Sequence, residues 1–330
     1  MRQTAVLFCL WIFGVYGVQT DFDSVVVGSS PICMCEAIYR AKTGEQVLLV
    51  ERAAECGGAW KSITICGIPN VDLGCHEFGN NKQVEQFLEE YIGCRMIRNA
   101  PKQKGKGVKK SDWGTYPQRG CHEMSQNLQR LMQEAGVTIL LSTRLEKVFI
   151  DKNRKIAEVQ INGSRYSTKK IVVTAYSEIE IENVYHINNT RQSKYPHLYM
   201  LVRDPAPTQF TYHQPSITGV TRLMNVTQFT GLEERGFQLI SLQVRDEKAL
   251  DQGAKYFEEL KRLELISRSA ELVCMESYIY EQSVFDKSVL TKAGPEAAAI
   301  FEQLDTNHIS NISKYVDKWK KVMAPCSSAH

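Results

Sequence analysis

The sequence predicts an α/β protein in which a parallel sheet is joined to a second, mostly antiparallel sheet. Two patterns in the chain lead to this prediction. Near the N-terminus, two short runs dominated by valine and leucine, residues 22–27 and 47–50, flank a helical segment, as expected for strands that a parallel sheet buries on both faces. Between residues 194 and 244, several strand-like runs follow one another without an intervening helix, which favours antiparallel pairing.

Length and composition describe an ordinary globular chain of about two domains. The 330 residues are 43% hydrophobic and 23% charged, which excludes a disordered tail, a collagen-like fibre and a multi-span membrane protein. The 40 basic and 37 acidic side chains leave a net charge of +3, so the chain has no electrostatic footprint for DNA or RNA. We therefore expect no nucleic-acid partner.

The N-terminus indicates a secretory signal peptide, predicted to span residues 1–19. After Arg2, an apolar run over residues 5–17 is too short to span a bilayer comfortably, and Val15 and Gly17 are small enough for positions −3 and −1 of a cleavage site. We expect a secreted or secretory-lumen protein without a stable membrane span after cleavage. Four Asn-x-Ser/Thr sequences suit a glycoprotein. The alternative is a buried first strand or helix in a cytoplasmic protein.

The ten cysteines do not follow a simple disulfide pattern. Removal of Cys9 with the signal peptide leaves nine, an odd number. Cys33 and Cys35 fall in a tight turn, a poor place for a disulfide, so we expect small buried thiols there. No cluster with zinc-like spacing follows this pair, and the sequence predicts no metal site.

One segment near the N-terminus is typical of a dinucleotide-binding βαβ unit. A buried strand (22–27) ends at Gly28, a helical segment follows at 34–41, and a second buried strand (47–50) leads into Glu51. In such a unit the first strand leads into a tight turn, the helix N-terminus faces the pyrophosphate, and the acid accepts hydrogen bonds from the adenosine ribose. The first domain is therefore predicted to be Rossmann-like and to bind FAD or NAD(P).

The turn of this unit departs from the usual glycine pattern, G-x-G-x-x-G. Only Gly28 is present, because Ser30 and Cys33 occupy the second and third glycine positions, with Pro31 between them. The second position is where the phosphates approach the backbone, and the third is where helix and strand nearly touch. Both replacements are small, so we expect the fold to be kept. The hydroxymethyl group of Ser30 either displaces the phosphates or hydrogen-bonds them, and the sequence leaves both alternatives open.

A pair of glycines follows shortly after the acid of the βαβ unit. Between Arg52 and Trp60, Gly57 and Gly58 allow backbone amides to approach a second phosphate region. At these residues the chain resembles the flavoprotein superfamily that includes FAD-dependent amine oxidases, protoporphyrinogen oxidase and UDP-galactopyranose mutase. Residues 71–78 resemble the next block of that family, in which an aspartate, a glycine and often a histidine approach the flavin ring.

The resemblance continues to about residue 176. An amphipathic helix ends at Gly136, and residues 142–148, which include Leu145, are similar to the family segment whose backbone pairs with the adenine. A hairpin with an Asn-Gly turn and a buried strand at 171–175 follow.

Beyond this point the match is one of architecture only. We expect an amphipathic helix at 249–265, a further strand at 273–283, and closing helices at 297–304 and 313–323. The predicted division is an FAD/NAD(P)-binding domain of residues 20–80 and 115–185, with 290–330 as its completion, and an inserted substrate-binding domain of residues 81–114 and 186–289.

One element of the family is not found. Members finish with a Gly-Asp motif and a short helix that hold the flavin's ribityl chain and pyrophosphate, but no Gly-Asp dipeptide follows Ser241. The nearest candidate is the sequence Asp-Thr-Asn-His at residues 305–308. Together with Ser30 and Cys33, this departure keeps open a degenerate relative that binds a ligand or partner without catalysis.

The resemblance implies an FAD-dependent oxidoreductase of the amine-oxidase type, in which a small organic substrate passes a hydride to the flavin. His76 is the candidate residue near the ring, as an electrostatic or proton-transfer partner. A nicotinamide-dependent dehydrogenase is a third hypothesis, against which the paired glycines argue. The candidate cofactor-binding residues are Gly28, Ser30, Pro31, Cys33, Glu51, Arg52, Gly57, Gly58, Trp60 and Leu145.

Overall fold

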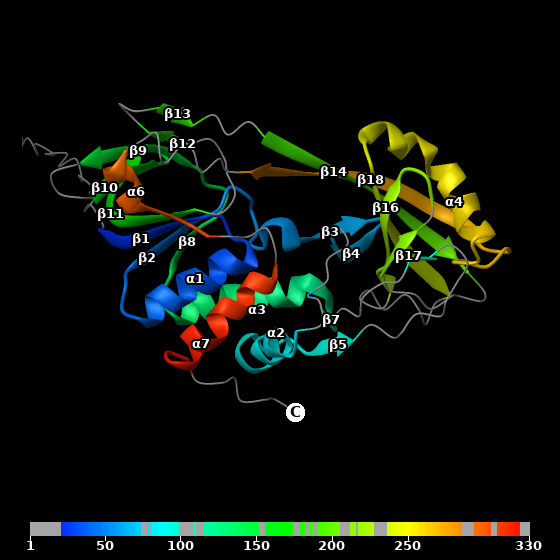
Figure 1. The fold of residues 1–330 in the computed structure, drawn as a ribbon, viewed down its shortest axis with the longest axis horizontal. Coiled ribbons are helices and arrows are strands. Elements are labelled where there is room, and N and C mark those ends of the chain that lie inside the picture. The colour runs from blue at the N-terminus through cyan, green and yellow to red at the C-terminus, as the bar shows by residue number, and fades with distance from the viewer. Residues whose placement is uncertain are drawn as a thin grey trace, which may run out of the picture.

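A computed structural model gives the fold, which has two lobes, each built around its own sheet (Figure 1). The predicted signal peptide lies outside the described residues, as do residues 305–308. The structure describes residues 21–73, 78, 81–98, 108–109, 115–151, 156–173, 179–181, 185–187, 191–204, 212–215, 217–227, 236–284, 294–304 and 309–323.

The first sheet comprises β1 (Phe22–Val27), β2 (Val47–Val50), β8 (Thr138–Leu140), β9 (Leu145–Asp151), β10 (Ile156–Ile161), β11 (Ser164–Val173), β12 (Ile179–Ile181), β13 (Tyr185–Ile187) and β19 (Phe301–Gln303). Within the described residues its order is β13-β12-β9-β10-β11-β1-β2-β8, with β19 beside β11. The strands β8, β2, β1, β11 and β19 run parallel, whereas β9, β10 and β11 form an antiparallel meander. The predicted parallel strands at 22–27 and 47–50 are confirmed.

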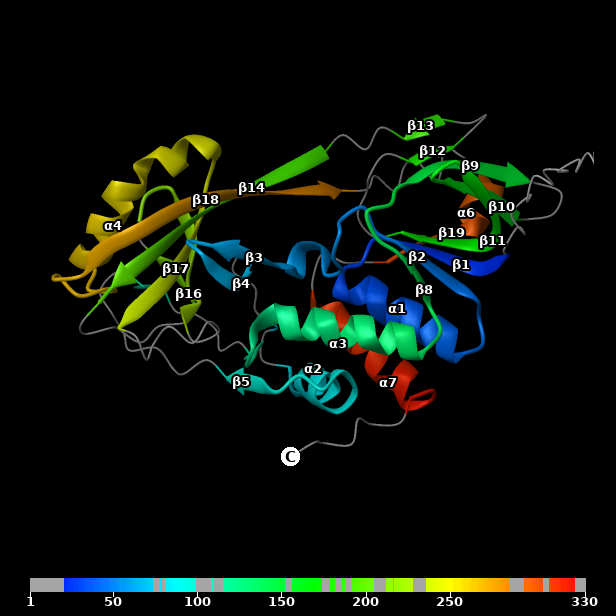
Figure 2. The ribbon, with the colours of Figure 1, turned by 180° about the vertical axis from the view of Figure 1, so that it is seen from behind.

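Both faces of the first sheet are covered. One face carries α1 (Pro31–Lys42), α3 (Gly120–Glu134) and α7 (Lys314–Lys320), with α2 (Lys82–Phe87) and a π-helical turn (Leu88–Ile92) packed beside them (Figures 1 and 2). Val26 belongs to the core beneath these helices, whereas Val25 and Val27 belong to the core on the opposite face. Burial on both faces explains why β1 is an unbroken valine run and does not alternate with polar residues.

Two predictions about the first lobe are wrong in detail. The hairpin strand and the buried strand predicted at 171–175 form one continuous strand, β11. Residues 297–304 are not a single helix, because α6 (Pro295–Ile300) is followed directly by β19. Phe301 pairs with Ile171 and is buried, so tertiary pairing outweighs the local helical pattern.

The second sheet comprises β6 (Val108–Lys109), β14 (Arg191–Arg203), β15 (Tyr212–Pro215), β16 (Val220–Asn225), β17 (Phe237–Val244) and β18 (Glu271–Val284). Its order is β18-β14-β17-β16-β15-β6, and every pairing among the described strands is antiparallel. The prediction of a mostly antiparallel second sheet is therefore confirmed, with β18 as an edge strand.

One helix, α4 (Gly253–Arg262), covers the outer face of this sheet, and it is shorter than the helix predicted at 249–265 because a 3₁₀ segment (Glu247–Gln252) precedes it. Gly253 allows the helix to approach the sheet closely. A Cβ atom at this position would lie 2.3 Å from Sδ of Met275 and 3.2 Å from Cδ2 of Leu198.

Two short ladders complete the fold: β3 (Ser62–Ile65) with β4 (Ile68–Asp72), and β5 (Met96–Arg98) with β7 (Thr115–Pro117). The β3–β4 hairpin extends from the first lobe toward the second sheet (Figure 2). On the inner face of that sheet, the fully buried Tyr199 donates a hydrogen bond of 3.1 Å to the backbone oxygen of Asp72. This bond ties the hairpin to β14 and so joins the two lobes.

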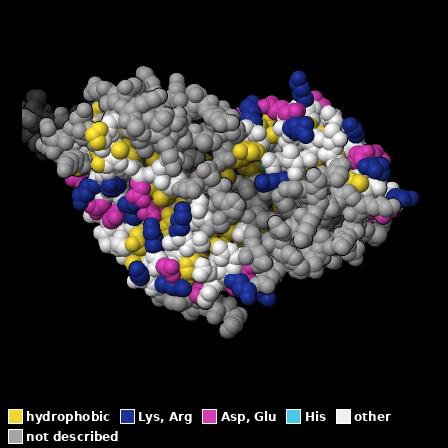
Figure 3. All heavy atoms as spheres, in the orientation of Figure 1, with side chains coloured by type: hydrophobic (Ala, Val, Ile, Leu, Met, Phe, Trp, Pro, Cys, Tyr) yellow, Lys and Arg dark blue, Asp and Glu magenta, His cyan; other side chains and the backbone are white. Residues whose placement is uncertain are grey.

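The surface shown in Figure 3 carries basic and acidic side chains interspersed over its described part. No helix within the described ranges is long and apolar enough to cross a membrane.

The C-terminal helix is part of the first lobe. The ring of Trp319 is fully buried and lies 5.0 Å from the ring of Phe87 and 6.3 Å from that of Tyr91. Tyr315 donates a hydrogen bond of 2.9 Å to the buried carboxylate of Glu36 in α1. Residues near the two ends of the chain therefore share one core.

We expect Trp319→Ala to lower the free energy of unfolding by about 3–5 kcal/mol, because it empties a large buried site. Urea denaturation followed by circular dichroism measures this loss. The matched control is Lys320→Ala on the exposed side of the same helix, for which we expect a change within about 0.5 kcal/mol. A loss below about 1 kcal/mol for Trp319→Ala would show that α7 does not belong to this core.

Candidate cofactor-binding site

The turn between β1 and α1 is set by a glycine. Gly28 has a φ of +96°, a region that residues with a Cβ rarely adopt. Its amide donates a hydrogen bond of 2.8 Å to the oxygen of Val50, which ties the ends of the parallel strands β1 and β2 together. The carboxyl ends of these strands form the edge at which open α/β sheets bind ligands.

Ser30 caps the helix that begins in this turn. Its Oγ accepts a hydrogen bond of 3.4 Å from the amide of Cys33 and lies 3.2 Å from Sγ of Cys33, to which it donates. Pro31, at the first helical position, has no amide hydrogen, and the Ser30 cap occupies the amide of Cys33. The amide of Ile32 is therefore the first-turn donor that the cap does not occupy. The hydroxyl that replaces the second glycine is therefore directed at the helix.

Glu51 lies at the centre of the turn. Its side chain is buried, and Oε2 accepts hydrogen bonds from the amide and the hydroxyl of Ser29 at 2.8 and 2.7 Å. Oε1 accepts a further hydrogen bond of 2.8 Å from the amide of Ala53. Three of the roughly four lone-pair positions of the carboxylate are thus occupied, and the one that remains, on Oε1, can accept a hydrogen bond from a ligand hydroxyl.

The paired glycines pack against the same turn. The amide of Gly57 lies 3.1 Å from both the backbone oxygen and the Oγ of Ser29. Gly57 and Gly58 have φ values of +127° and +58°. A Cβ atom on Gly58 would lie 3.2 Å from Cα of Ser30, and one on Gly57 would lie 2.9 Å from Oγ of Ser125. Glycine is therefore required where two stretches of backbone meet.

Arg52 is exposed, and its charge lowers the pKa of Tyr280, a residue that the sequence analysis did not single out. Burial raises the pKa of Tyr280 in β18 to about 12, and the neighbouring positive charge of Arg52 opposes part of that rise. The ring of Tyr195 in β14 stacks on that of Tyr280, with 6.1 Å between the centroids. The end of the second sheet therefore approaches the end of β2. No local pattern predicts this contact, because it joins distant segments.

The other predicted cofactor residues lie in packed positions. Cys33 is fully buried in the core beneath the helices, as is Cys35. The half-buried ring of Trp60 lies 4.9 Å from that of Phe78. Leu145 is buried in the opposite core and pairs with a residue of β10. The side chain of Leu145 thus serves packing.

The block at residues 71–78 is described only in part, and His76 lies outside the described residues. Asp72 is buried, and its carboxylate accepts hydrogen bonds from Ser62 Oγ at 2.6 Å, from the Tyr116 hydroxyl, and from the Cys121 amide at 3.0 Å to each oxygen. Burial raises the pKa of Tyr116, and the adjacent Asp72 carboxylate adds to the rise. This aspartate therefore caps α3 and holds the hairpin in place.

Part of the chain matches a known protein family. Residues 23–179 match the sequence model of a family described as FAD dependent oxidoreductase. The chain resembles FAD-dependent oxidoreductases. A search of curated proteins gives no match.

Solved structures with a similar fold include two oxidoreductases and a mutase. An oxidoreductase from Methanosarcina mazei superposes with a TM-score of 0.61 at 12% identity, over 90% of this chain and 99% of that one. Putrescine oxidase bound to putrescine gives 0.61 at 12% identity, over 92% and 97%. Reduced UDP-galactopyranose mutase gives 0.62 at 11% identity, over 89% and 91%.

These findings confirm two predictions. The first is the resemblance to the flavoprotein superfamily of amine oxidases and UDP-galactopyranose mutase. The second is the fold, a Rossmann-like FAD/NAD(P)-binding domain joined to a mostly antiparallel domain. The family match supports an FAD-dependent oxidoreductase.

The site also sets the reactivity of a neighbouring thiol. Burial raises the pKa of Cys56 to about 11, and the Glu51 carboxylate adds to the rise. The folded state therefore favours the neutral thiol. The part of the free energy of unfolding that comes from this preference is lost as the pH rises through about 11. We expect Cys56 in the folded protein to carry about 100-fold less thiolate near pH 8 than an ordinary cysteine.

Iodoacetamide labelling near pH 8, followed by peptide mass spectrometry, measures this difference against the urea-unfolded protein. Because burial also limits access, Glu51→Gln is the decisive comparison, and we expect it to speed the labelling of folded Cys56. The matched control, Glu55→Gln, changes an exposed carboxylate and should leave the rate unchanged. Equal labelling rates in the wild type and Glu51→Gln would contradict the electrostatic part of the explanation.

Proposed function

We propose that the chain is an FAD-dependent oxidoreductase that takes a hydride from a small organic substrate of the amine class. The observation that best supports this proposal is the position of Glu51, whose buried carboxylate lies at the end of β2 and holds the turn of Gly28, Ser29 and Ser30. An acid in this place is the group that binds an adenosine ribose in dinucleotide-binding folds.

The described residues fit an FAD nucleotide. The turn brings together a carboxylate, a helix N-terminus and two glycines. The carboxylate has one unoccupied acceptor position, and the glycines have no Cβ atoms that would cover the backbone. Ribose hydroxyls donate to carboxylates, and pyrophosphates bind at helix N-termini. The capping hydroxyl of Ser30 occupies the amide of Cys33, so the amide of Ile32 is the first-turn donor that would bind a phosphate.

Each group then has a defined task. Glu51 would hold the adenosine ribose through Oε1, while its other bonds keep the turn fixed. The Ile32 amide and the positive end of α1 would face the pyrophosphate. Gly57 and Gly58 would allow a close approach of the second phosphate region. We also propose that the backbone near Leu145 meets the adenine.

When bound, the flavin supplies the redox chemistry by accepting a hydride at its ring. The inner face of the second sheet carries aromatic side chains, including Tyr199 and Tyr278, packed against the core of the first lobe. The fully buried Tyr199 would help to exclude water, and the half-buried Tyr278 would orient an apolar part of the substrate. His76 remains our proposed electrostatic or proton-transfer partner near the ring.

The predicted export of the chain to the secretory pathway stays a proposal, as does glycosylation. N-terminal sequencing of secreted material decides the first point, because a retained Met1 excludes cleavage. A binding protein that has lost catalysis is the alternative to the enzyme, and the titration below separates the two.

The proposal is tested by titrating the purified full chain with FAD and with FMN and following flavin fluorescence. FMN lacks the adenosine that Glu51 would bind. We expect Glu51→Gln to weaken FAD binding by about 10- to 100-fold, since a hydrogen bond to a charged group contributes about 1.5–3 kcal/mol. Binding of FMN should change less than about threefold.

Glu55→Gln is again the matched control and should bind FAD as the wild type does. A wild-type chain that binds no FAD would contradict the proposal. If the protein binds FAD but no amine reduces and bleaches the flavin under anaerobic conditions, the proposed cofactor site is retained and the proposed oxidase activity is wrong.

A further inference from the structure

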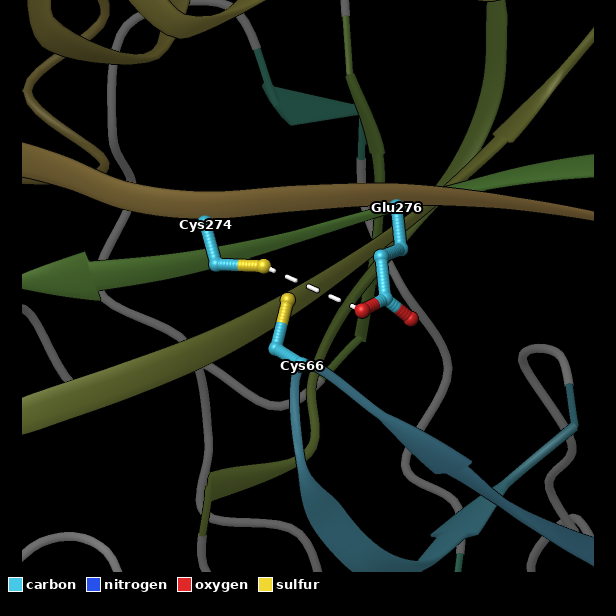
Figure 4. A group of neighbouring side chains, drawn as sticks. All are labelled: Cys66, Cys274 and Glu276. Atoms are coloured by element: carbon cyan, nitrogen blue, oxygen red, sulfur yellow. Dashed lines mark hydrogen bonds between the residues drawn. The ribbon is translucent and has the colours of Figure 1, made fainter.

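The tip of the β3–β4 hairpin meets the edge strand β18 at two cysteines and one glutamate. Cys66 lies in the turn between β3 and β4, where its φ is +50°, and Cys274 and Glu276 lie on β18 (Figure 4). Residues two apart on a strand share a face, so Cys274 and Glu276 both face the turn. The two thiols point toward one another, and the carboxylate approaches them from β18.

The three groups lie at separations close to those of metal ligands. One ligand atom from each side chain lies within 4.8 Å of the other two, and Sγ of Cys274 is 3.9 Å from Oε1 of Glu276. Around a tetrahedral Zn²⁺ ion, with Zn–S of about 2.3 Å and Zn–O of about 2.1 Å, ligand atoms are about 3.6–3.8 Å apart. Small side-chain rotations therefore suffice to place all three around one ion.

This arrangement is unusual within the described part of the chain. It is the one group of three His, Cys, Asp or Glu side chains there whose ligand atoms lie this close together. Both cysteines are free thiols. Glu271, on the same strand, pairs with Arg203, whereas Glu276 has no ion pair with a described lysine or arginine. The Glu276 carboxylate and two thiols thus converge, and no described lysine or arginine neutralises the carboxylate.

We propose that Cys66, Cys274 and Glu276 bind one Zn²⁺ ion, with water as the fourth ligand. Two thiolates and a carboxylate suit this borderline-soft, tetrahedral cation. As each sulfur–zinc bond forms, the thiol releases its proton to solvent, and no electron is transferred. The cysteines are half-buried and Glu276 is exposed, so the ion enters from solvent.

The ion would act as a clamp between the lobes. The hairpin that carries Cys66 ends at Asp72, which caps α3, and the strand that carries Cys274 is the edge of the second sheet. Fixing the hairpin tip to β18 would stabilise the junction beside the proposed substrate region. The sequence gives no sign of this site, because the turn and the strand are far apart along the chain and no zinc-like spacing links them.

The test uses the full-length, reduced protein after treatment with a chelator. Zn²⁺ is titrated in competition with a chromophoric chelator, and Co²⁺ replaces it in a second titration followed by absorption spectroscopy. We expect one Zn²⁺ per chain with a dissociation constant below about 1 µM, and a thiolate-to-Co²⁺ charge-transfer band. Cys66→Ser and Cys274→Ser should each weaken Zn²⁺ binding by about 100-fold or more, and Glu276→Gln by about tenfold.

The matched control is Glu271→Gln on the same strand, which should change the affinity by less than about twofold. Thermal unfolding without metal shows whether each variant is folded, and Zn²⁺ should raise the melting temperature of the wild type and the control but not of the cysteine variants. Binding that is unchanged in the cysteine variants would overturn the proposal. The absence of a thiolate-to-Co²⁺ band would also overturn the proposal. A Cys66–Cys274 disulfide that forms in air despite equimolar Zn²⁺ would overturn it as well, because the pair would then be a redox cross-link.

Discussion

The buried carboxylate of Glu51 fixes the geometry on which the candidate cofactor site depends. It accepts hydrogen bonds from Ser29 and Ala53, and Ser29 in turn binds the amide of Gly57. A buried charge is tolerated only when donors replace the water it has lost. The same bonds therefore make the carboxylate stable and hold three separate segments in one arrangement. A nucleotide that binds there meets a site that is already formed, which lowers the entropic cost of binding.

A second buried carboxylate, that of Asp72, performs a related task at the junction of the lobes. It binds Ser62 in the hairpin, Tyr116 in β7 and the N-terminus of α3, while its backbone oxygen accepts a hydrogen bond from Tyr199 in the second sheet. A carboxylate at a helix N-terminus is favoured by the helix dipole. Gly120 makes room for it, because a Cβ atom there would lie 3.0 Å from the carboxylate. Between them, Glu51 and Asp72 place the candidate cofactor site relative to the second sheet.

Residue type and periodicity correctly predicted the elements that short segments of sequence determine. The valine run of β1, the Asn-Gly turn before β11 and the helix that ends before Gly136 follow directly from residue type and periodicity. The meeting of Gly28 and Glu51 was also predictable, because a βαβ unit brings the ends of its two parallel strands to the same edge.

The features that sequence reasoning missed depend on contacts between distant segments. The strand β19 exists because residues near position 300 pair with β11. The approach of Tyr280 to Arg52, the capping of α3 by Asp72 and the cluster around Cys66 likewise join parts of the chain that are far apart. In Ser30, sequence reasoning identified an unusual residue, but only the structure gave its hydroxyl a partner, namely Cys33.

The most direct test of the central claim is a crystal structure of the full chain with FAD bound. We expect a ribose hydroxyl of the adenosine within about 2.6–3.2 Å of Oε1 of Glu51, with the pyrophosphate at the N-terminus of α1. An adenosine bound elsewhere, or one whose ribose is separated from Glu51 by other side chains, would contradict the assignment of this turn as the cofactor site.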